Sequence, residues 1–198
     1  MLLDFYSEIY SWIRGGLFVL FLYHFLIFFQ NKSKLYLYYS LYLLALTIYL
    51  LQHVIPEDYT WLYDYLNFPI QFLAYAAYVS FARDLLDTRA HLLKWDKYFE
   101  IEAKILLILA VVFVLIQVFL GKSYQVEAFT IIAPFLTIFT LVSYYVIISK
   151  IKDNSARYFV AGSLIYVVFA NISFLEVFTG SEVFENLGVQ AMFFVYIG

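Results

Sequence analysis

Residues 15–51 read GGLFVLFLYHFLIFFQNKSKLYLYYSLYLLALTIYLL, and this stretch decides the fold. It joins two long apolar runs, 9–29 and 35–54, which are separated only by the polar gap 30–34. Each run can cross the membrane, because roughly 20 helical residues cover about 30 Å of hydrocarbon. An unpaired backbone group costs several kcal/mol in lipid, so only helices or closed β-barrels can span it. Barrel strands show short alternating segments and not long apolar runs, so these runs are helices. The stretch therefore predicts two membrane-spanning helices joined by a short turn.

The same alternation continues along the chain. It predicts further spans at about 62–81, 103–120, 128–149 and 158–178, with Pro69 and Pro134 as local kinks. A last apolar start, 187–198, has 12 residues and is too short to cross. Composition agrees, with 65% hydrophobic and 14% charged residues against about 45–50% and 25% in soluble domains. We predict one all-α polytopic bundle over 1–198, with six complete helices and an incomplete seventh, and expect the sequence to be a fragment.

The basic residues orient this bundle. Of the 12 Lys and Arg residues, only Arg14 and Lys122 lie in the opposite register to the rest. The others fall in alternate gaps: Lys32, Lys34, Arg83, Arg89, Lys94, Lys97, Lys104, Lys150, Lys152 and Arg157. Cytoplasmic loops carry such an excess of positive charge, so we expect the N-terminus outside. The first run is not read as a signal peptide, because its leading segment is acidic and no small-residue cleavage site follows.

The longest cytoplasmic connection, about 83–102, is not a plain linker. It contains RDLLDTRAHLLKWDKYFE, in which Leu85, Leu92, Asp96 and Phe99 recur at near-helical spacing. The charged residues lie mostly elsewhere, so the pattern indicates a short amphipathic helix at the inner interface. Membrane anchoring is the simpler role, and contact with an output domain is the alternative.

No catalytic or cofactor-binding constellation is visible. The chain has no Cys, no HExxH motif and no Gly-rich phosphate loop. His24 and His53 are separated by roughly 20 Å of membrane depth at 1.5 Å per residue, which argues against a shared metal or haem. No lysine lies in mid-span to carry retinal. We therefore expect no enzyme activity, no metal and no cofactor within these residues.

A few polar residues inside the spans could contact a ligand. The candidates are His24, Gln71, Asn171 and Glu176. Each has a simpler interpretation as a helix-to-helix hydrogen bond, which is the usual role of a polar side chain in a membrane bundle. The outer loops are acidic, with Glu57, Asp58, Asp64, Glu127, Glu182 and Glu185 against Lys122 alone, which could favour a cationic or polar ligand.

Several passages resemble one bacterial family. They are the stretch 15–51, with its paired glycines and Tyr-rich restart after a basic turn, the run FARDLLDTRAHLLKWDKYFE, and the final NLGVQAMFFVYIG. These look like the seven-transmembrane receptors with diverse intracellular signalling modules. The resemblance implies a sensor in the bacterial inner membrane, in which a histidine kinase, diguanylate cyclase or similar output follows helix seven. An outer sensory domain often precedes the bundle in this family, whereas only Met1–Glu8 precede the first span here.

The first functional hypothesis is therefore a sensory module that relays a ligand signal to a cytoplasmic output domain absent from this sequence. Its expected partners are the lipid bilayer, a small ligand and a signalling domain in cis or in trans, with no nucleic acid; a homodimer is compatible with this reading. The alternative is a small membrane transporter or carrier subunit, which predicts a charged midplane site at broken helices. Ionisable residues are nearly absent from mid-span, which disfavours it. A membrane enzyme or haem protein is the third and weakest hypothesis.

Overall fold

The computed structural model describes residues 5–53 and 59–179. Within these ranges the side chains of 5–10, 53, 60, 155 and 173–179 are not described. The expected seventh-span start, 187–198, lies outside the described residues, as do Glu57, Asp58, Glu182 and Glu185 of the acidic loops that we expect outside.

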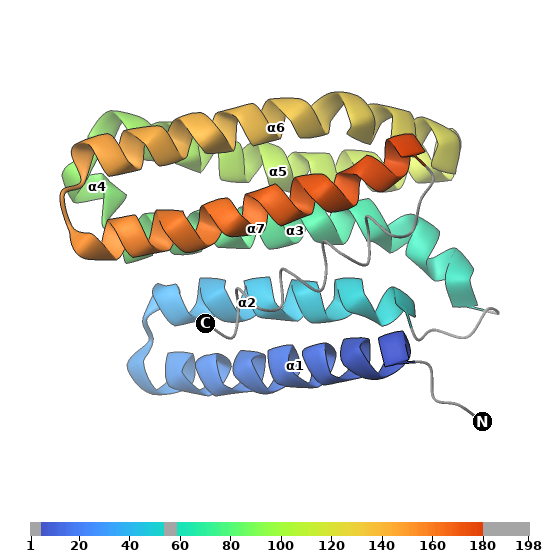
Figure 1. Cartoon of the computed structure of the whole chain (residues 1–198), viewed down its shortest axis with the longest axis horizontal. Coiled ribbons are helices and arrows are strands. Elements are labelled where there is room, and N and C mark those ends of the chain that lie inside the picture. The colour runs from blue at the N-terminus through green and yellow to red at the C-terminus, as the bar shows by residue number, and fades with distance from the viewer. Residues whose placement is uncertain (1–4, 54–58, 180–198) are drawn as a thin grey trace. The chain divides into compact units, whose positions relative to one another are not determined.

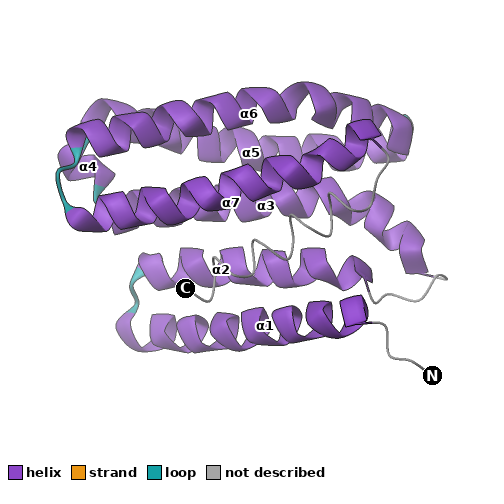
Figure 2. Cartoon of the chain, in the orientation of Figure 1, coloured by secondary structure: helices purple, strands orange, loops and turns teal. Residues whose placement is uncertain are grey.

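The described chain is a series of helices joined by short connections (Figures 1 and 2). Helix α1 spans Phe5–Asn31 and α2 spans Lys34–Tyr49, followed by the 3₁₀ helix η1, Leu50–His53. The later helices are α3 (Thr60–Leu85), α4 (Thr88–His91), α5 (Leu93–Phe119), α6 (Lys122–Lys150) and α7 (Asn154–Thr179). No strand occurs among the residues that the structure describes, so the predicted all-α class is confirmed.

Four segments of the described chain are long and apolar enough to cross a membrane. They are Ser11–Asn31, Lys34–Gln52, Leu93–Phe119 and Lys122–Lys150, and α7 adds a shorter apolar segment, Ala156–Ile172. Helix α3 holds the expected span 62–81 but is not among the four. Its first half carries Asp64, Asn67 and Gln71, and several tyrosines further lower its hydropathy. The chain is a multi-pass membrane protein.

Most helices begin before the predicted spans, above all α5, whereas α2 ends at Tyr49, before the predicted 54. Helix α5 starts at Leu93, ten residues before the expected 103. The residues of the predicted amphipathic segment 83–102 are divided among the end of α3, the four-residue α4 and the first turns of α5. Asp96 and Glu102, which lie in these first turns of α5, are buried, so a charged segment continues directly into the apolar part of the helix.

The chain divides into two compact units, residues 1–126 and 127–198. In the first unit α1 packs on α2, α2 on α3, and α3 on α5. Its core contains Leu43, Phe72, Leu106 and Phe113, which are almost completely buried. The rings of Phe72 and Phe113 join α3 to α5, with their centroids 4.8 Å apart.

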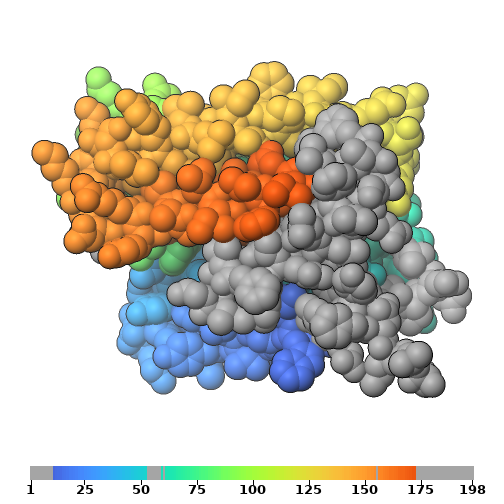
Figure 3. Space-filling model, viewed as in Figure 1, coloured from blue at the N-terminus to red at the C-terminus, as the bar shows by residue number. Residues whose placement is uncertain are grey.

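Large apolar side chains also cover the outside of the first unit. Helix α1, blue in Figure 3, exposes Trp12, Phe18, Val19, Leu26 and Phe29. In water such a surface would mark an interaction site, whereas lipid tails are as apolar as these side chains. In the second unit, Thr137 of α6 donates a hydrogen bond to Asn171 of α7, with an oxygen–oxygen distance of 3.3 Å.

Candidate functional site

The sharpest polar feature of the first unit lies where α3, α4 and α5 meet. After α3 ends at Leu85, Asp87 adopts a left-handed conformation with φ 41° and ψ 53°. Aspartate tolerates this conformation better than most L-residues. Leu86 and Leu92, on either side of α4, are both buried. The tight turn therefore places Thr88 and Arg89 beside the first turns of α5.

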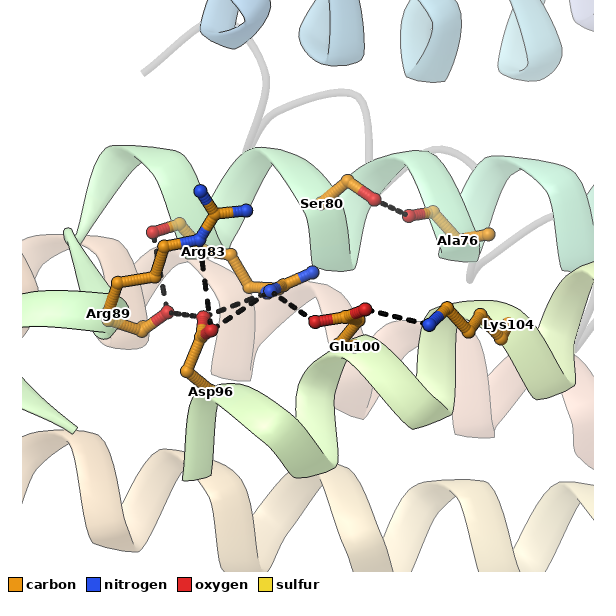
Figure 4. Close-up of polar contacts among 8 residues, drawn as sticks. Ala76, Ser80, Arg83, Arg89, Asp96, Glu100 and Lys104 are labelled. Carbon is orange, nitrogen blue, oxygen red and sulfur yellow. Dashed lines mark hydrogen bonds and ion pairs between the residues drawn. The ribbon is translucent and has the colours of Figure 1, made fainter. Parts of the chain in front are cut away.

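Six side chains form what we call the junction network: Arg83, Thr88, Arg89, Asp96, Glu100 and Lys104. Figure 4 labels all of them except Thr88. Asp96 lies at the centre of the network. Arg83 donates two hydrogen bonds to this carboxylate, from Nε to Oδ1 at 2.9 Å and from Nη2 to Oδ2 at 3.0 Å. The Thr88 hydroxyl donates a third to Oδ1 at 2.6 Å. The more distant Arg89 Nε lies 3.9 Å from Oδ2.

The network continues outward from this centre. Arg83 Nη2 also donates to Glu100 Oε2 at 3.5 Å, and Lys104 Nζ donates to Glu100 Oε1 at 2.7 Å. The two halves differ in exposure. The side chains of Arg83 and Asp96 are 11% and 9% exposed, whereas those of Lys104 and Glu100 are 67% and 45% exposed. The bidentate pair is therefore the part of the network that holds α3 to α5.

The contact between Arg83 and Asp96 favours the charged form of the arginine. The hydrogen bond to Asp96 raises the pKa of Arg83 above its usual value, despite the opposing effect of burial, so the guanidinium stays charged. A bidentate arginine–carboxylate pair is among the stronger side-chain hydrogen bonds and also fixes the relative orientation of its partners. The one hydroxyl bonded to the carboxylate, that of Thr88, is 1% exposed and so closed to a substrate, and the arrangement acts as a structural clasp between helices.

A second polar contact joins the same two helices further along α5. The Tyr75 hydroxyl of α3 donates a hydrogen bond to Glu102 Oε1 of α5 at 2.8 Å. Glu102 is 8% exposed, and no ion pair within the described part of the chain includes it. Two polar contacts therefore join α3 to α5: the ion pair of Arg83 with Asp96 and, further from α4 along both helices, the hydrogen bond of Tyr75 to Glu102.

The predicted ligand-site residues of the first unit are not brought together by hydrogen bonds. His24 Nδ1 lies 2.8 Å from the carbonyl oxygen of Leu20 on its own helix. The imidazole also meets the rings of Tyr36 and Tyr39 on α2, at centroid distances of 6.2 and 4.6 Å. Gln71 Nε2 donates to Asn67 Oδ1, one turn back on α3, at 3.0 Å.

In the second unit, Asn171 makes a hydrogen bond between two helices, the ordinary role of a polar side chain in a membrane bundle. It accepts a hydrogen bond from Thr137 of α6, and its Nδ2 donates to the Val167 carbonyl at 2.8 Å. Glu176 belongs to α7, but its side chain lies outside the described residues. Among the described residues, no group of three or more His, Asp or Glu side chains could hold a metal ion.

Sequence reasoning did not single out Arg83, Thr88 or Tyr75. One signal was available: Asp96 shares a helical stripe with leucines, and an acid on an apolar face requires a partner. The pattern cannot show which of the nearby basic residues supplies it. That choice depends on the left-handed turn at Asp87, which brings α4 back against α5.

Comparison with known proteins identifies the family. The model of the "7TM diverse intracellular signalling" family matches residues 8–198, and the chain belongs to this family of seven-transmembrane receptor domains. No curated protein and no solved structure matches the chain. The family resemblance expected from the stretch 15–51 is thereby confirmed, and the chain is a membrane signalling domain.

Proposed function

We propose that this chain is the sensory module of a receptor in the bacterial inner membrane and relays a ligand signal to a cytoplasmic output domain, in cis or in trans. The observation that carries the proposal is the family match over residues 8–198. The alternate placement of ten basic residues supports an outer N-terminus, six spans and the start of a seventh at 187–198. In that topology the end of the seventh span lies in the cytoplasm, where the output domain would act.

The α3–α5 pair is the part of this module best suited to carry a signal across the membrane. Its packing runs from the aromatic contact of Phe72 with Phe113 to the bidentate pair of Arg83 with Asp96. Two helices clasped at the end that we place in the cytoplasm cannot slide independently there. A ligand can shift such a pair only by having different affinities for two arrangements of the bundle.

The ligand site remains a proposal, with His24, Gln71, Asn171 and Glu176 as its residues. Gln71 and Asn171 are half-buried and polar within largely apolar helices, which suits contact with a small polar ligand. The test uses the complete receptor and compares Glu176→Gln and Asn171→Ala with the unmodified protein. Loss of ligand response with retained basal output supports this site, and unchanged response and output in both variants rejects it.

A transporter or carrier is the second candidate function, and the observation favouring it is Glu102. A carboxyl group buried between two helices, with a tyrosine as its hydrogen-bond donor, is one component of a proton or cation pathway. The two functions differ in a direct measurement. Sealed vesicles containing this protein alone would take up a solute or protons if it is a carrier, and they would not if it is a receptor module.

A further inference from the structure

The first turns of α5 expose a face on the side away from the buried Arg83–Asp96 pair. We call it the lysine face and define it by six exposed residues: Lys94, Lys97, Tyr98, Ile101, Ile105 and Ile108. From Lys94, the positions of Tyr98 and the three isoleucines follow at intervals of four, three, four and three, and Lys97 lies four residues before Ile101. The six therefore form one stripe along an α-helix. Tyr98 is 54% exposed and Ile108 is 61% exposed, which shows that the stripe is open along its length.

The acidic residues of these turns lie outside the lysine face. Asp96 and Glu102 are buried. Glu100 is engaged by Arg83 and Lys104. No ion pair in the described ranges includes Lys94 or Lys97. The lysine face therefore carries uncompensated positive charge at one end and apolar or aromatic side chains over the rest, with Lys104 beside it paired to Glu100.

The length of α5 fixes the depth of these lysines. A helix of 27 residues is about 40 Å long at 1.5 Å per residue. The hydrocarbon is about 30 Å thick, and about 40–45 Å with the headgroup regions included. If α5 spans the bilayer, Lys94 and Lys97 lie at headgroup depth and Ile101, Ile105 and Ile108 follow into the hydrocarbon. This is the order of groups in a phospholipid: a charged head followed by an apolar tail.

We propose that the lysine face of α5 binds an anionic phospholipid. The ammonium groups of Lys94 and Lys97 contact the headgroup phosphate, and one acyl chain lies along the three isoleucines. A zwitterionic lipid lacks the net charge that two unpaired lysines favour. A second copy of the chain fits less well, because a two-fold contact through this face would bring the lysines of both copies together. Like charges at that distance oppose such a contact.

The test measures whether lipids next to Trp95 are enriched in anionic headgroups. The chain has three Trp residues, so Trp12→Phe and Trp61→Phe leave Trp95, which neighbours Lys94, as the sole indole. The protein is placed in vesicles containing equal fractions of phosphatidylglycerol and phosphatidylcholine, with one or the other brominated. The ratio of the two quenching efficiencies reports the local preference. We expect phosphatidylglycerol to be favoured, by about fivefold for each lysine.

Three variants on this background separate a site from general charge attraction. Lys94→Gln with Lys97→Gln should bring the ratio close to one, whereas Lys94→Arg with Lys97→Arg should preserve it. The matched control, Lys32→Gln with Lys34→Gln, removes the same charge from the turn after α1 and the start of α2, and it should leave the ratio unchanged. Circular dichroism establishes that each variant is folded.

The results that overturn the proposal are equally specific. A ratio of one in the parent protein shows no preference for the anionic lipid. An equal fall in the control variant shows attraction to the whole charged surface and no site on α5. Absence of quenching by either brominated lipid shows that protein covers this face, which would favour a second copy as its occupant.

Discussion

Removing Arg83 should destabilise the first unit more than removing any other single charge of the junction network. Arg83→Met leaves the Asp96 carboxylate 9% exposed, with Thr88 as its one short hydrogen-bond donor and Arg89 at 3.9 Å. Breaking a buried ion pair on one side costs about 3–5 kcal/mol. Because the Arg83 and Asp96 side chains are still about a tenth exposed, we expect the free energy of unfolding to fall by about 3 kcal/mol, near the lower end of that range.

The assay is thermal unfolding of the purified protein in detergent, followed by circular dichroism. For a chain of this size, about 1 kcal/mol shifts Tm by roughly 2–4 °C, so Arg83→Met should lower Tm by about 6–12 °C. The matched control is Lys104→Met, which removes a positive charge from the exposed pair with Glu100. Such a pair contributes about 0.5 kcal/mol or less, which corresponds to a shift of about 2 °C or less.

A double-mutant cycle then isolates the pair itself. Asp96→Leu alone leaves Arg83 with Glu100 as its remaining partner, so it should also destabilise. The double variant, Arg83→Met with Asp96→Leu, should be much more stable than the sum of the two single effects predicts, since no buried charge is left unpaired. Additive effects, or a loss in Arg83→Met no larger than that in Lys104→Met, would refute the view that this pair clasps α3 to α5.

Three further changes test other parts of the structure by the same Tm measurement. Gly121→Ala should lower the free energy of unfolding by about 1–2 kcal/mol, because Gly121 has φ +92° and L-residues are disfavoured there. The control Gly15→Ala lies in a helix with nothing near the new Cβ and should not lower it. Equal losses of stability in the two variants would contradict this. Glu102→Gln should keep a free energy of unfolding within about 1 kcal/mol of the parent, because the amide oxygen still accepts a hydrogen bond. Glu102→Lys buries a new charge and should be less stable. A large loss of stability in the glutamine variant would reveal a dependence on the carboxylate. Asn171→Ala should cost about 0.6 kcal/mol, the average for interhelical hydrogen bonds in membranes, and no change would show that its bond to α6 does not stabilise the bundle.

The helices could be predicted from the sequence because long apolar runs leave the backbone few options in lipid. Their ends could not, since helix α5 continues through a charged segment. A hydropathy pattern treats Asp96 as a polar residue that ends a span. The structure shows it buried, with three short hydrogen bonds that compensate the cost. The boundary therefore depends on pairing between residues on separate helices, which a local pattern does not contain.

The candidate site was harder to predict for a related reason. His24 and Gln71 stood out because they are polar residues in apolar runs, and each bonds back to its own helix. Whether such a side chain turns inward to its backbone or outward to a neighbour is decided by its rotamer and by what packs beside it. Asn171 does both. Polar residues in spans can therefore be found from sequence, but their partners require the packed structure.

Helix α5 combines two opposite requirements at one end. Its buried side carries acids that bind α3 and α4, and its exposed side carries lysines that we assign to anionic lipid. Asp96 and Lys97 are adjacent in sequence, yet the helix turns them about 100° apart, so each meets a different partner. A lipid held at Lys94 and Lys97 would resist movement of α5 along the membrane normal, and the clasp would pass that resistance to α3. A ligand-driven shift of either helix must therefore work against both contacts, which makes anionic lipid content a determinant of the signalling equilibrium under the proposed function.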